Sequence, residues 1–540
     1  MTSEYFDITL PEADERHSPL QPQAQDGQQG IQTLTPQSYL EPLSQQEAPV
    51  YTSPLSSPAV SSDTAFFGTV PENNPVPNLL KAIRDIVVTP RTDVPVGMLE
   101  GRVTALSGLS VSLSGLQDFT GIGDRIRILG LDGRETDAEI VAFRQNVAIA
   151  MPFGSLEGIG SGCRAFFPLY EPEQRRQMAG GTLRINPLWC GRVIDPMGRP
   201  LDGKGPLAPD GIPCKLHAPP PDAAARARLG PRIDLGVRTL NLFTTCREGQ
   251  RLGLFAGSGV GKSTLMGMLA RNTVCDVAVI SLVGERGREV REFIEDDLGP
   301  EGLARSVVVV ATSDTSPLMR REAAYAAMTV AEYFRDQGLS VLFLMDSVTR
   351  FCHALREIGL SSGEPPATRG YPPSVFAELP RLLERAGPGH IPQNGKAGQI
   401  TAMFSVLVEG DDHNEPVADA VRGILDGHVV MERRIAESGR YPAINVLRSL
   451  SRSVPGCNSA AENNLIREAR VCMATWEDMQ DMVRLGAYRK GSDPQVDEAI
   501  RVVPAIEQVL RQSRDEKVTL EQSFEALQHA LSPVSSTLSS

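Results

Sequence analysis

The sequence predicts an α/β domain that lies between a small β-barrel and a C-terminal helical domain. Residues 97–167 contain short β-type runs separated by Gly and Asp turns, a pattern typical of small barrels. Residues 168–455 alternate apolar strand-like runs with helical segments, which indicates a parallel sheet. Residues 456–531 carry helical patterns alone. We therefore expect three folded domains in this order.

The local patterns also predict individual elements. Barrel strands are expected at 101–106, 109–113, 125–129, 135–143 and 147–151. Buried strands of the α/β domain are expected at 251–255, 277–283, 307–311, 341–345 and 400–408. One helix has clear ends, because Ser316 can cap it, Pro317 suits its first turn and Gly338 suits its C-terminus. The C-terminal helices are expected at 462–488 and 495–529.

The two ends of the chain differ from these domains. Residues 1–77 are rich in Ser, Pro, Gln and acids, with Arg16 as their only Lys or Arg, so we expect a disordered polar extension. Residues 78–96 form a short amphipathic segment, which either packs on the next domain or docks on a partner. Its apolar residues fall on one helical face and are Leu79, Leu80, Ile83, Ile86 and Val87. Residues 532–540 are a Ser-rich tail that we also expect to be disordered.

Composition excludes several classes of protein. The 540-residue chain is 41% hydrophobic, as globular proteins are, and has no apolar run long enough to span a bilayer. Its start is acidic rather than signal-like, so we expect a cytoplasmic protein. A net charge of -13 argues against a broad nucleic-acid surface. The eight cysteines form no close pairs, which indicates reduced and mostly buried thiols.

A phosphate-binding loop follows the predicted strand 251–255. It reads Ala256, Gly257, Ser258, Gly259, Val260, Gly261, Lys262, Ser263, with Thr264 next. The glycines allow backbone N–H groups to converge on phosphate oxygens at a helix N-terminus. Lys262 suits the β- and γ-phosphates of a nucleotide, and Ser263 offers its hydroxyl to Mg²⁺. Ala256 stands where the pattern normally has Gly, at the entrance of the loop, and we expect little effect.

Two further strand ends carry carboxylates. Asp346 follows the strand 341–345 and suits the magnesium shell, whereas Glu285 and Arg286 follow the strand 277–283. Because the carboxyl ends of parallel strands meet at one edge of a sheet, these side chains are expected beside the phosphate loop. Glu285 would then polarise the attacking water and Arg286 would meet the γ-phosphate. The alternative is a surface ion pair of little energetic value.

These motifs resemble the flagellar and type III protein-export ATPases, relatives of the catalytic subunit of rotary ATP synthases. The similarity spans residues 97–500. It includes the runs 191–195, 250–264, 283–289 (VGERGRE), 345–351 (MDSVTRF) and 363–387. It implies a RecA-like P-loop ATPase core, an N-terminal β-barrel, a C-terminal helical domain and a homohexamer with ATP between subunits.

The same resemblance assigns roles to four residues. Glu285 matches the catalytic carboxylate, where the non-catalytic subunits of ATP synthase carry Gln, and Asp346 matches the magnesium-shell aspartate. Tyr441 matches the aromatic residue that stacks on adenine; otherwise it is a buried loop tyrosine. Arg452 matches the arginine finger that reaches the neighbour's ATP; otherwise it is a solvated charge.

The resemblance also implies partners and a location. It predicts an ATPase at the cytoplasmic face of the inner-membrane export apparatus, and it is compatible with peripheral membrane association. The expected partners are a stator-like negative regulator at the N-terminus, a stalk protein in the central channel, the export gate and chaperone–substrate complexes, with no nucleic acid. The loop 364–373 resembles the segment that faces the channel; otherwise it is a rigid surface loop.

Residues 316–321 and 367–371 look more flagellar than virulence-type, so we expect flagellar protein export, with a virulence-type secretion ATPase as the alternative. An ATP-synthase-like rotary subunit, a hexameric RNA translocase and a binding-only module stay open as other interpretations.

Overall fold

The computed structural model describes residues 95, 97–170, 175, 180–391, 396–408 and 415–532. The predicted extension at 1–77, the apolar face from Leu79 to Val87 and the tail after residue 532 lie outside the described residues. None of the described helices is both long and apolar enough to cross a membrane. All eight cysteines carry free thiols, and four of them are buried.

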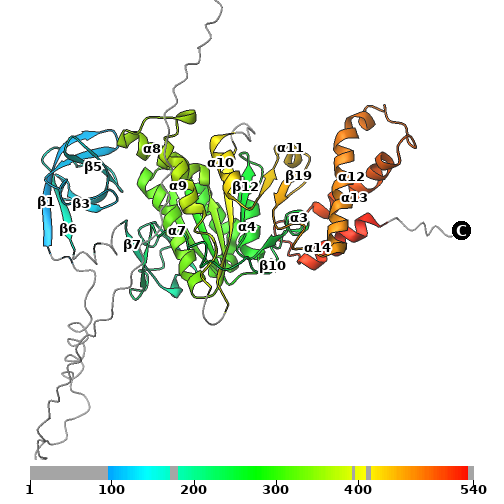
Figure 1. The fold of residues 1–540 in the computed structure, drawn as a ribbon, viewed down its shortest axis with the longest axis horizontal. Coiled ribbons are helices and arrows are strands. Elements are labelled where there is room, and N and C mark those ends of the chain that lie inside the picture. The colour runs from blue at the N-terminus through cyan, green and yellow to red at the C-terminus, as the bar shows by residue number, and fades with distance from the viewer. Residues whose placement is uncertain are drawn as a thin grey trace, which may run out of the picture. The chain divides into compact units, whose positions relative to one another are not determined.

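The first domain is a closed barrel with the strand order β1-β2-β5-β4-β3-β6 (Figure 1). Its strands are β1 (Gly97–Ser107), β2 (Ser110–Ser114), β3 (Arg125–Leu129), β4 (Glu135–Arg144), β5 (Val147–Pro152) and β6 (Arg164–Leu169). The five predicted strands are confirmed. The sequence did not predict β6, which pairs with both β1 and β3 and so closes the barrel.

The α/β domain is built on a nine-stranded sheet with the order β19-β18-β12-β17-β15-β13-β14-β8, to which β16 adds at β17. The strands are β8 (Arg192–Ile194), β12 (Arg251–Ala256), β13 (Val277–Glu285), β14 (Ser306–Thr312), β15 (Ser340–Asp346), β16 (Gly387–Pro388), β17 (Gln399–Leu407), β18 (Gly427–Met431) and β19 (Ile444–Ser451). All neighbours are parallel except β16 with β17 and β18 with β19. The five predicted strands are confirmed, and together they form the central part of the sheet.

Two short pairs lie outside this sheet, β7 (Thr182–Ile185) with β9 (Ile212–Lys215) and β10 (Arg232–Ile233) with β11 (Cys246–Arg247).

Helices cover both faces of the nine-stranded sheet. Alternate residues of β13 face opposite sides, so Val279 joins the hydrophobic cluster under α7, whereas Ile280 joins the cluster under α4. Figure 1 shows α7, α8 and α9 on one side and α4 on the other. The helices are α3 (Arg238–Phe243), α4 (Lys262–Asn272), α5 (Gly287–Glu292), α6 (Gly299–Ala304), α7 (Pro317–Asp336), α8 (Val348–Ser362), α9 (Pro373–Leu383), α10 (Pro416–Ile424) and α11 (Arg433–Glu437). Two 3₁₀-helices, η1 (Pro187–Trp189) and η3 (Thr368–Gly370), and one π-helix, η2 (Phe293–Leu298), are also present.

The ends of α7 confirm the signals read from the sequence. The Oγ of Ser316 accepts a hydrogen bond from the backbone N–H of Met319 at 3.3 Å, and Pro317 is the first helical residue. Gly338 adopts a φ of 86° just after the helix, a conformation that glycine reaches without strain.

The C-terminal domain contains α12 (Ala460–Arg484), α13 (Pro494–Leu510) and α14 (Leu520–Leu531). The predicted run 462–488 is too long, because Gly486 takes a φ of 72° and ends the helix. The predicted run 495–529 is two helices, because Thr519 and Gln522 form a capping box that starts α14. These helices pack against Leu242 and Phe243 of α3. The exact domain boundaries stay predictions.

A buried ionic cluster joins the barrel to α7. Glu322 is fully buried and contacts Arg125 of the barrel at 3.1 Å and His217 at 2.9 Å. Arg321 contacts Glu322 at 2.7 Å and Glu139 of the barrel at 2.6 Å. Burial raises the pKa of Glu322, but Arg321, His217 and Arg125 lower it by more, so the pKa lies below its ordinary value.

Candidate functional site

The phosphate loop connects β12 to α4. Gly259 and Gly261 have φ values of 77° and 89°, a left-handed conformation that favours glycine. Val260, between them, is buried in the core and anchors the loop. Gly261 is the N-cap of α4, and within the described part of the chain no side chain bonds to the first N–H groups of the helix. Those groups are therefore free to bind an anion.

A cavity of about 770 Å³ opens above this loop. Of the residues predicted for the site, the cavity is lined by Gly257, Ser258, Gly259, Gly261, Lys262, Ser263, Thr264, Glu285 and Arg286. Ala256 and Val260 lie buried behind the loop. Asp346, Tyr441 and Arg452 are not among the lining residues. The structure thus brings most of the predicted site together at one edge of the sheet.

Lys262 lies between two carboxylates. Its Nζ donates a hydrogen bond to Oδ1 of Asp346 and is 3.8 Å from Oε1 of Glu285. Asp346 also accepts a hydrogen bond of 2.8 Å from Oγ of Ser405 on β17. The side chains of Lys262, Glu285 and Asp346 are only 11%, 15% and 6% exposed. The strand order β12-β17-β15-β13 explains why these distant residues meet.

The carboxyl group of Glu285 has a raised pKa. Burial, and secondly the negative charge of Asp346, raise the pKa of Glu285 from 4.5 to about 7, although Lys262 opposes the shift. Its Oε1 is buried and accepts no hydrogen bond from any residue that the structure describes. A carboxylate with a pKa near neutrality and a free acceptor atom suits proton transfer from water.

Arg286 lines the cavity but its side chain is 78% exposed. It pairs with Glu289 at 3.5 Å, and not with Glu285 as the alternative from the sequence had it. An exposed pair of this kind is weak, so Arg286 can exchange Glu289 for a ligand at little cost.

Tyr441 and Arg452 occupy different places. A Cβ atom at Gly261 would be 3.5 Å from the ring of Tyr441, so this ring lies against the phosphate loop. The ring is not buried, since Tyr441 is 49% exposed. Arg452 follows β19, where its backbone N–H donates to the carbonyl of Asp426 at 2.9 Å, and it is exposed. Arg452 does not line the cavity of its own chain.

The structure adds three charged residues and a histidine that sequence reasoning did not select. Arg350 and His353 of α8, Glu289 of α5 and Arg433 of α11 line the cavity. Arg433 donates to the carbonyl of Ser258 at 3.3 Å. Arg350 and His353 were detectable, because they lie one helical turn apart in the helix that begins just after Asp346.

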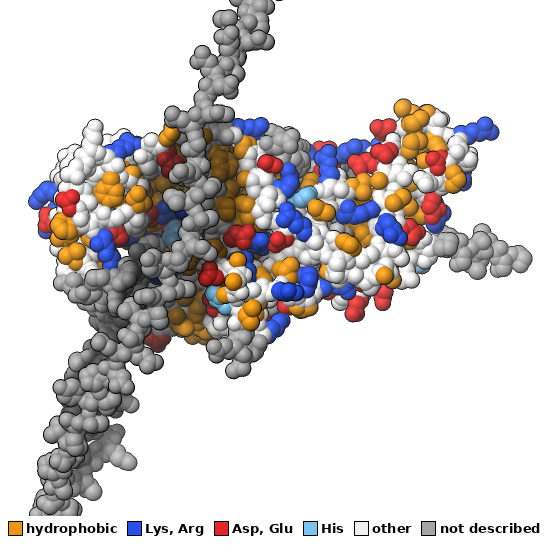
Figure 2. All heavy atoms as spheres, viewed as in Figure 1, with side chains coloured by type: hydrophobic (Ala, Val, Ile, Leu, Met, Phe, Trp, Pro, Cys, Tyr) orange, Lys and Arg blue, Asp and Glu red, His pale blue; other side chains and the backbone are white. Residues whose placement is uncertain are grey.

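On the face that Figure 2 shows, Lys and Arg side chains are interspersed with Asp and Glu side chains and form no continuous basic surface.

Comparison with known proteins agrees with this site. P-loop ATPases are defined by a strand, a glycine-rich loop and a helix in succession, together with carboxylates at the ends of neighbouring strands, and this chain has all of these features. Residues 236–451 match the nucleotide-binding domain of the ATP synthase alpha/beta family, and residues 459–529 match the T3SS EscN ATPase C-terminal domain.

The chain is 54% identical over 425 residues to the flagellum-specific ATP synthase of Caulobacter vibrioides, covering 78% of this chain and 94% of that protein. It is 46% identical to the type 3 secretion system ATPase of Xanthomonas euvesicatoria, covering 80% and 94%. The structure of the assembled ATPase EscN from enteropathogenic E. coli matches with a TM-score of 0.72 and 37% identity, covering 80% of this chain and 100% of EscN. The chain belongs to the family of flagellum-specific ATP synthases and type 3 secretion ATPases, and it is an ATPase. The predicted family, fold class and enzyme class are confirmed.

Proposed function

We propose that this ATPase drives flagellar protein export, by hydrolysing ATP to release export substrates from chaperones and pass them into the export apparatus. The higher identity to a flagellar relative than to a type 3 secretion relative supports the flagellar choice. The observation that carries the hydrolytic role is the Glu285 carboxyl, which lies beside Lys262 and whose buried Oε1 accepts no hydrogen bond from the residues that the structure describes.

The residues around the cavity suit ATP as substrate. The N–H groups of the phosphate loop and α4 bind phosphate oxygens, while Lys262 exchanges Asp346 for the β- and γ-phosphates. The Ser263 hydroxyl and the Asp346 carboxylate are oxygen donors of the kind that Mg²⁺ prefers. Mg²⁺ would neutralise phosphate charge when bound. Glu285 positions the attacking water and takes its proton, and Arg286 contacts the γ-phosphate.

Completion of the site requires a neighbouring subunit. Arg452 is exposed and outside the cavity of its own chain, which supports a role as an arginine finger toward the next subunit of a homohexamer. Tyr441, with its ring against the phosphate loop, stacks on the adenine. The relative EscN has been solved in assembled form.

The proposed partners are those expected for an export ATPase of this family. EscN has also been solved in complex with its central stalk, EscO. We assign the equivalent contact of this chain to the exposed loop around Arg369, with the other expected partners being an N-terminal regulator, the export gate and chaperone–substrate complexes. The enzyme then works in the cytoplasm at the inner membrane.

Two experiments test this proposal. Glu285→Gln is expected to bind ATP normally but to lose turnover by on the order of a hundredfold to ten-thousandfold. Glu292→Gln is the matched control, because Glu292 is an exposed residue of the following helix that, among the residues the structure describes, pairs with Arg288 alone. Unchanged hydrolysis by Glu285→Gln would contradict the assigned role.

Deletion of the gene is expected to stop secretion of filament subunits and motility while growth stays normal. Loss of effector secretion with normal motility would instead favour virulence-type secretion. A growth defect in ATP synthesis would favour the rotary subunit, and ATPase activity stimulated by RNA would favour the translocase.

A further inference from the structure

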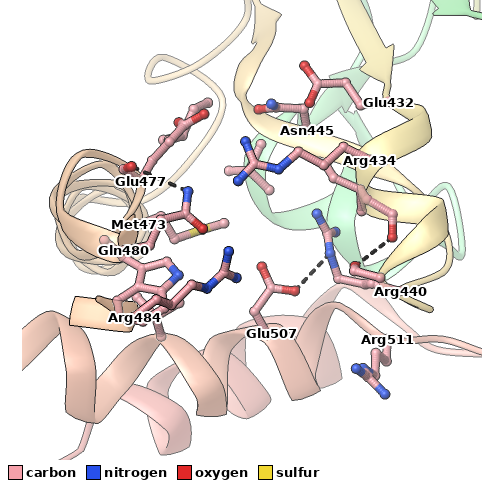
Figure 3. A pocket seen from close by; sticks show the side chains of 16 residues that line it. Glu432, Arg434, Arg440, Asn445, Met473, Glu477, Gln480, Arg484, Glu507 and Arg511 are labelled. Carbon is pink, nitrogen blue, oxygen red and sulfur yellow. Dashed lines mark hydrogen bonds and ion pairs between the residues drawn. The ribbon is translucent and has the colours of Figure 1, made fainter. Parts of the chain in front are cut away.

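A second cavity also involves α11, since Arg434 and Ile435 line it whereas Arg433 lines the nucleotide cavity. It has a volume of about 350 Å³, within the size range of ligand sites. The residues after β18 and the start of β19 form one wall, and α12 and α13 of the C-terminal domain form the other. Figure 3 shows Arg434 and Arg440 projecting from the first wall and Met473, Gln480 and Glu507 from the second.

The lining of this cavity is partly apolar and partly positively charged. The apolar part consists of Ile435, Val446, Leu447, Met473, Trp476 and Val503. Four arginines and three glutamates also line the cavity. One of the glutamates, Glu432, is engaged by Arg448 at 2.9 Å, and Arg448 is outside the lining. The remaining charge is therefore positive.

Arg440 supplies the most specific feature. It is only 3% exposed, and its Nε donates to Glu507 at 2.8 Å while Nη2 donates to the carbonyl of Ile444 at 2.9 Å. Its Nη1 is buried and bonds to no residue that the structure describes. A buried guanidinium nitrogen without an acceptor is unfavourable, so a small movement of Arg440 that brings Nη1 to an anion in the cavity would supply that acceptor.

We propose that this cavity binds a small organic anion, a carboxylate, sulfonate or phosphate ester with an apolar or aromatic body. The anionic group bonds to Arg440 and Arg434, and the body packs on Trp476 and Met473.

Binding is coupled to the nucleotide site through Tyr441. Arg440 directly precedes Tyr441, whose ring lies against the phosphate loop. The carbonyl of Tyr441 accepts a hydrogen bond of 2.9 Å from the backbone N–H of Gln512, which follows α13. A ligand that draws the two walls together thus shifts Tyr441 and alters the affinity for ATP. This coupling rests on the adenine-stacking role proposed for Tyr441, whereas the binding site does not.

The test uses 8-anilinonaphthalene-1-sulfonate, an aromatic sulfonate whose fluorescence rises on binding, with the full chain and saturating ADP to fill the nucleotide cavity. We expect one saturable site per chain, at least tenfold weaker binding in Arg434→Glu and near-parent binding in Arg434→Lys. Arg467→Glu, an equal charge reversal on α12 outside the cavity, is expected to bind as the parent does. Arg434 is exposed, so its substitution leaves the core intact.

Three results would overturn the site. The first is equal binding of the sulfonate by Arg434→Glu and by the parent, and the second is equal binding of the uncharged analogue N-phenyl-1-naphthylamine by the parent. The third is loss of sulfonate binding when the subunits assemble, because the cavity would then be an interface between copies. The coupling predicts at least a twofold change in the KM for ATP when the sulfonate binds the parent, and no change in Arg434→Glu. An unchanged KM in the parent despite saturable binding would overturn the coupling while leaving the site in place.

Discussion

The largely buried carboxyl of Glu285 is expected to destabilise the nucleotide-free protein, and Glu285→Gln tests this directly. The pKa of Glu285 rises from 4.5 to about 7 on folding, first because of burial. Since the folded state holds this proton more tightly than the unfolded chain, stability falls as the pH rises through the window from 4.5 to 7. Each tenfold change in acidity is worth about 1.4 kcal/mol, so ionised Glu285 costs about 3 kcal/mol at pH 8.

Glutamine has the shape of the protonated carboxyl but does not ionise. Glu285→Gln is therefore expected to raise the free energy of unfolding by about 3 kcal/mol at pH 8 and by less than about 1 kcal/mol at pH 5. The variant would thus be more stable yet far less active, as expected when a functional group is held in an unfavourable environment.

Urea unfolding of the ATPase core gives the measurement. The chain has two tryptophans, and Trp189 is buried in the core under α7. In a Trp476→Phe background, tryptophan fluorescence reports the core alone. A stability difference between variant and parent that is the same at pH 5 and pH 8 would refute the assigned burial and charge environment of Glu285.

Three further predictions follow from the contacts. Tyr441→Ala is expected to raise the KM for ATP about fivefold to a hundredfold through loss of stacking, whereas Tyr441→Phe keeps the parent KM; equal effects of the two would exclude stacking. Arg452→Ala is expected to bind ATP normally but to lose about a thousandfold in turnover, and mixed rings with inactive Glu285→Gln subunits, which keep Arg452, are expected to regain part of it; no regain would place Arg452 in its own site. Glu322→Gln leaves Arg125 without its buried counter-charge and leaves Arg321 with Glu139 alone, so it is expected to reduce the free energy of unfolding by about 3 kcal/mol, measured in urea; a loss below about 1 kcal/mol would contradict the role of this cluster.

Much of the fold could be read from the sequence because its signals are local. The central strands β12, β13, β14, β15 and β17 are apolar runs buried on both faces, which is typical of parallel sheets. Edge strands lack that signal: β19 is antiparallel at the sheet edge, and its Leu450 is 50% exposed. The barrel strand β6 ends in Pro168 and Leu169, so its closing role depends on pairing with β1 and β3, which are distant in sequence.

The candidate site likewise contains residues that the local sequence predicts and residues that it does not. The phosphate loop was recognisable because its chemistry lies in consecutive residues. Glu285 and Asp346 were placed correctly because strand ends of a parallel sheet share an edge. Glu289 and Arg433 were missed, since nothing in their local sequence shows that α5 and α11 face the same cavity.

The sequence by itself determined the domain order, the nucleotide-binding loop and the ATPase family, because each depends on residue types at short, fixed spacings. Only the tertiary structure decided the electrostatic state of the site. The contact of Lys262 with Asp346, the raised pKa of Glu285 and the unsatisfied Nη1 of Arg440 all depend on burial and on distances between remote segments. Burial strengthens these electrostatic interactions because it removes water from around the charges. The degree of burial depends on the whole fold, so it cannot be predicted from a local sequence pattern.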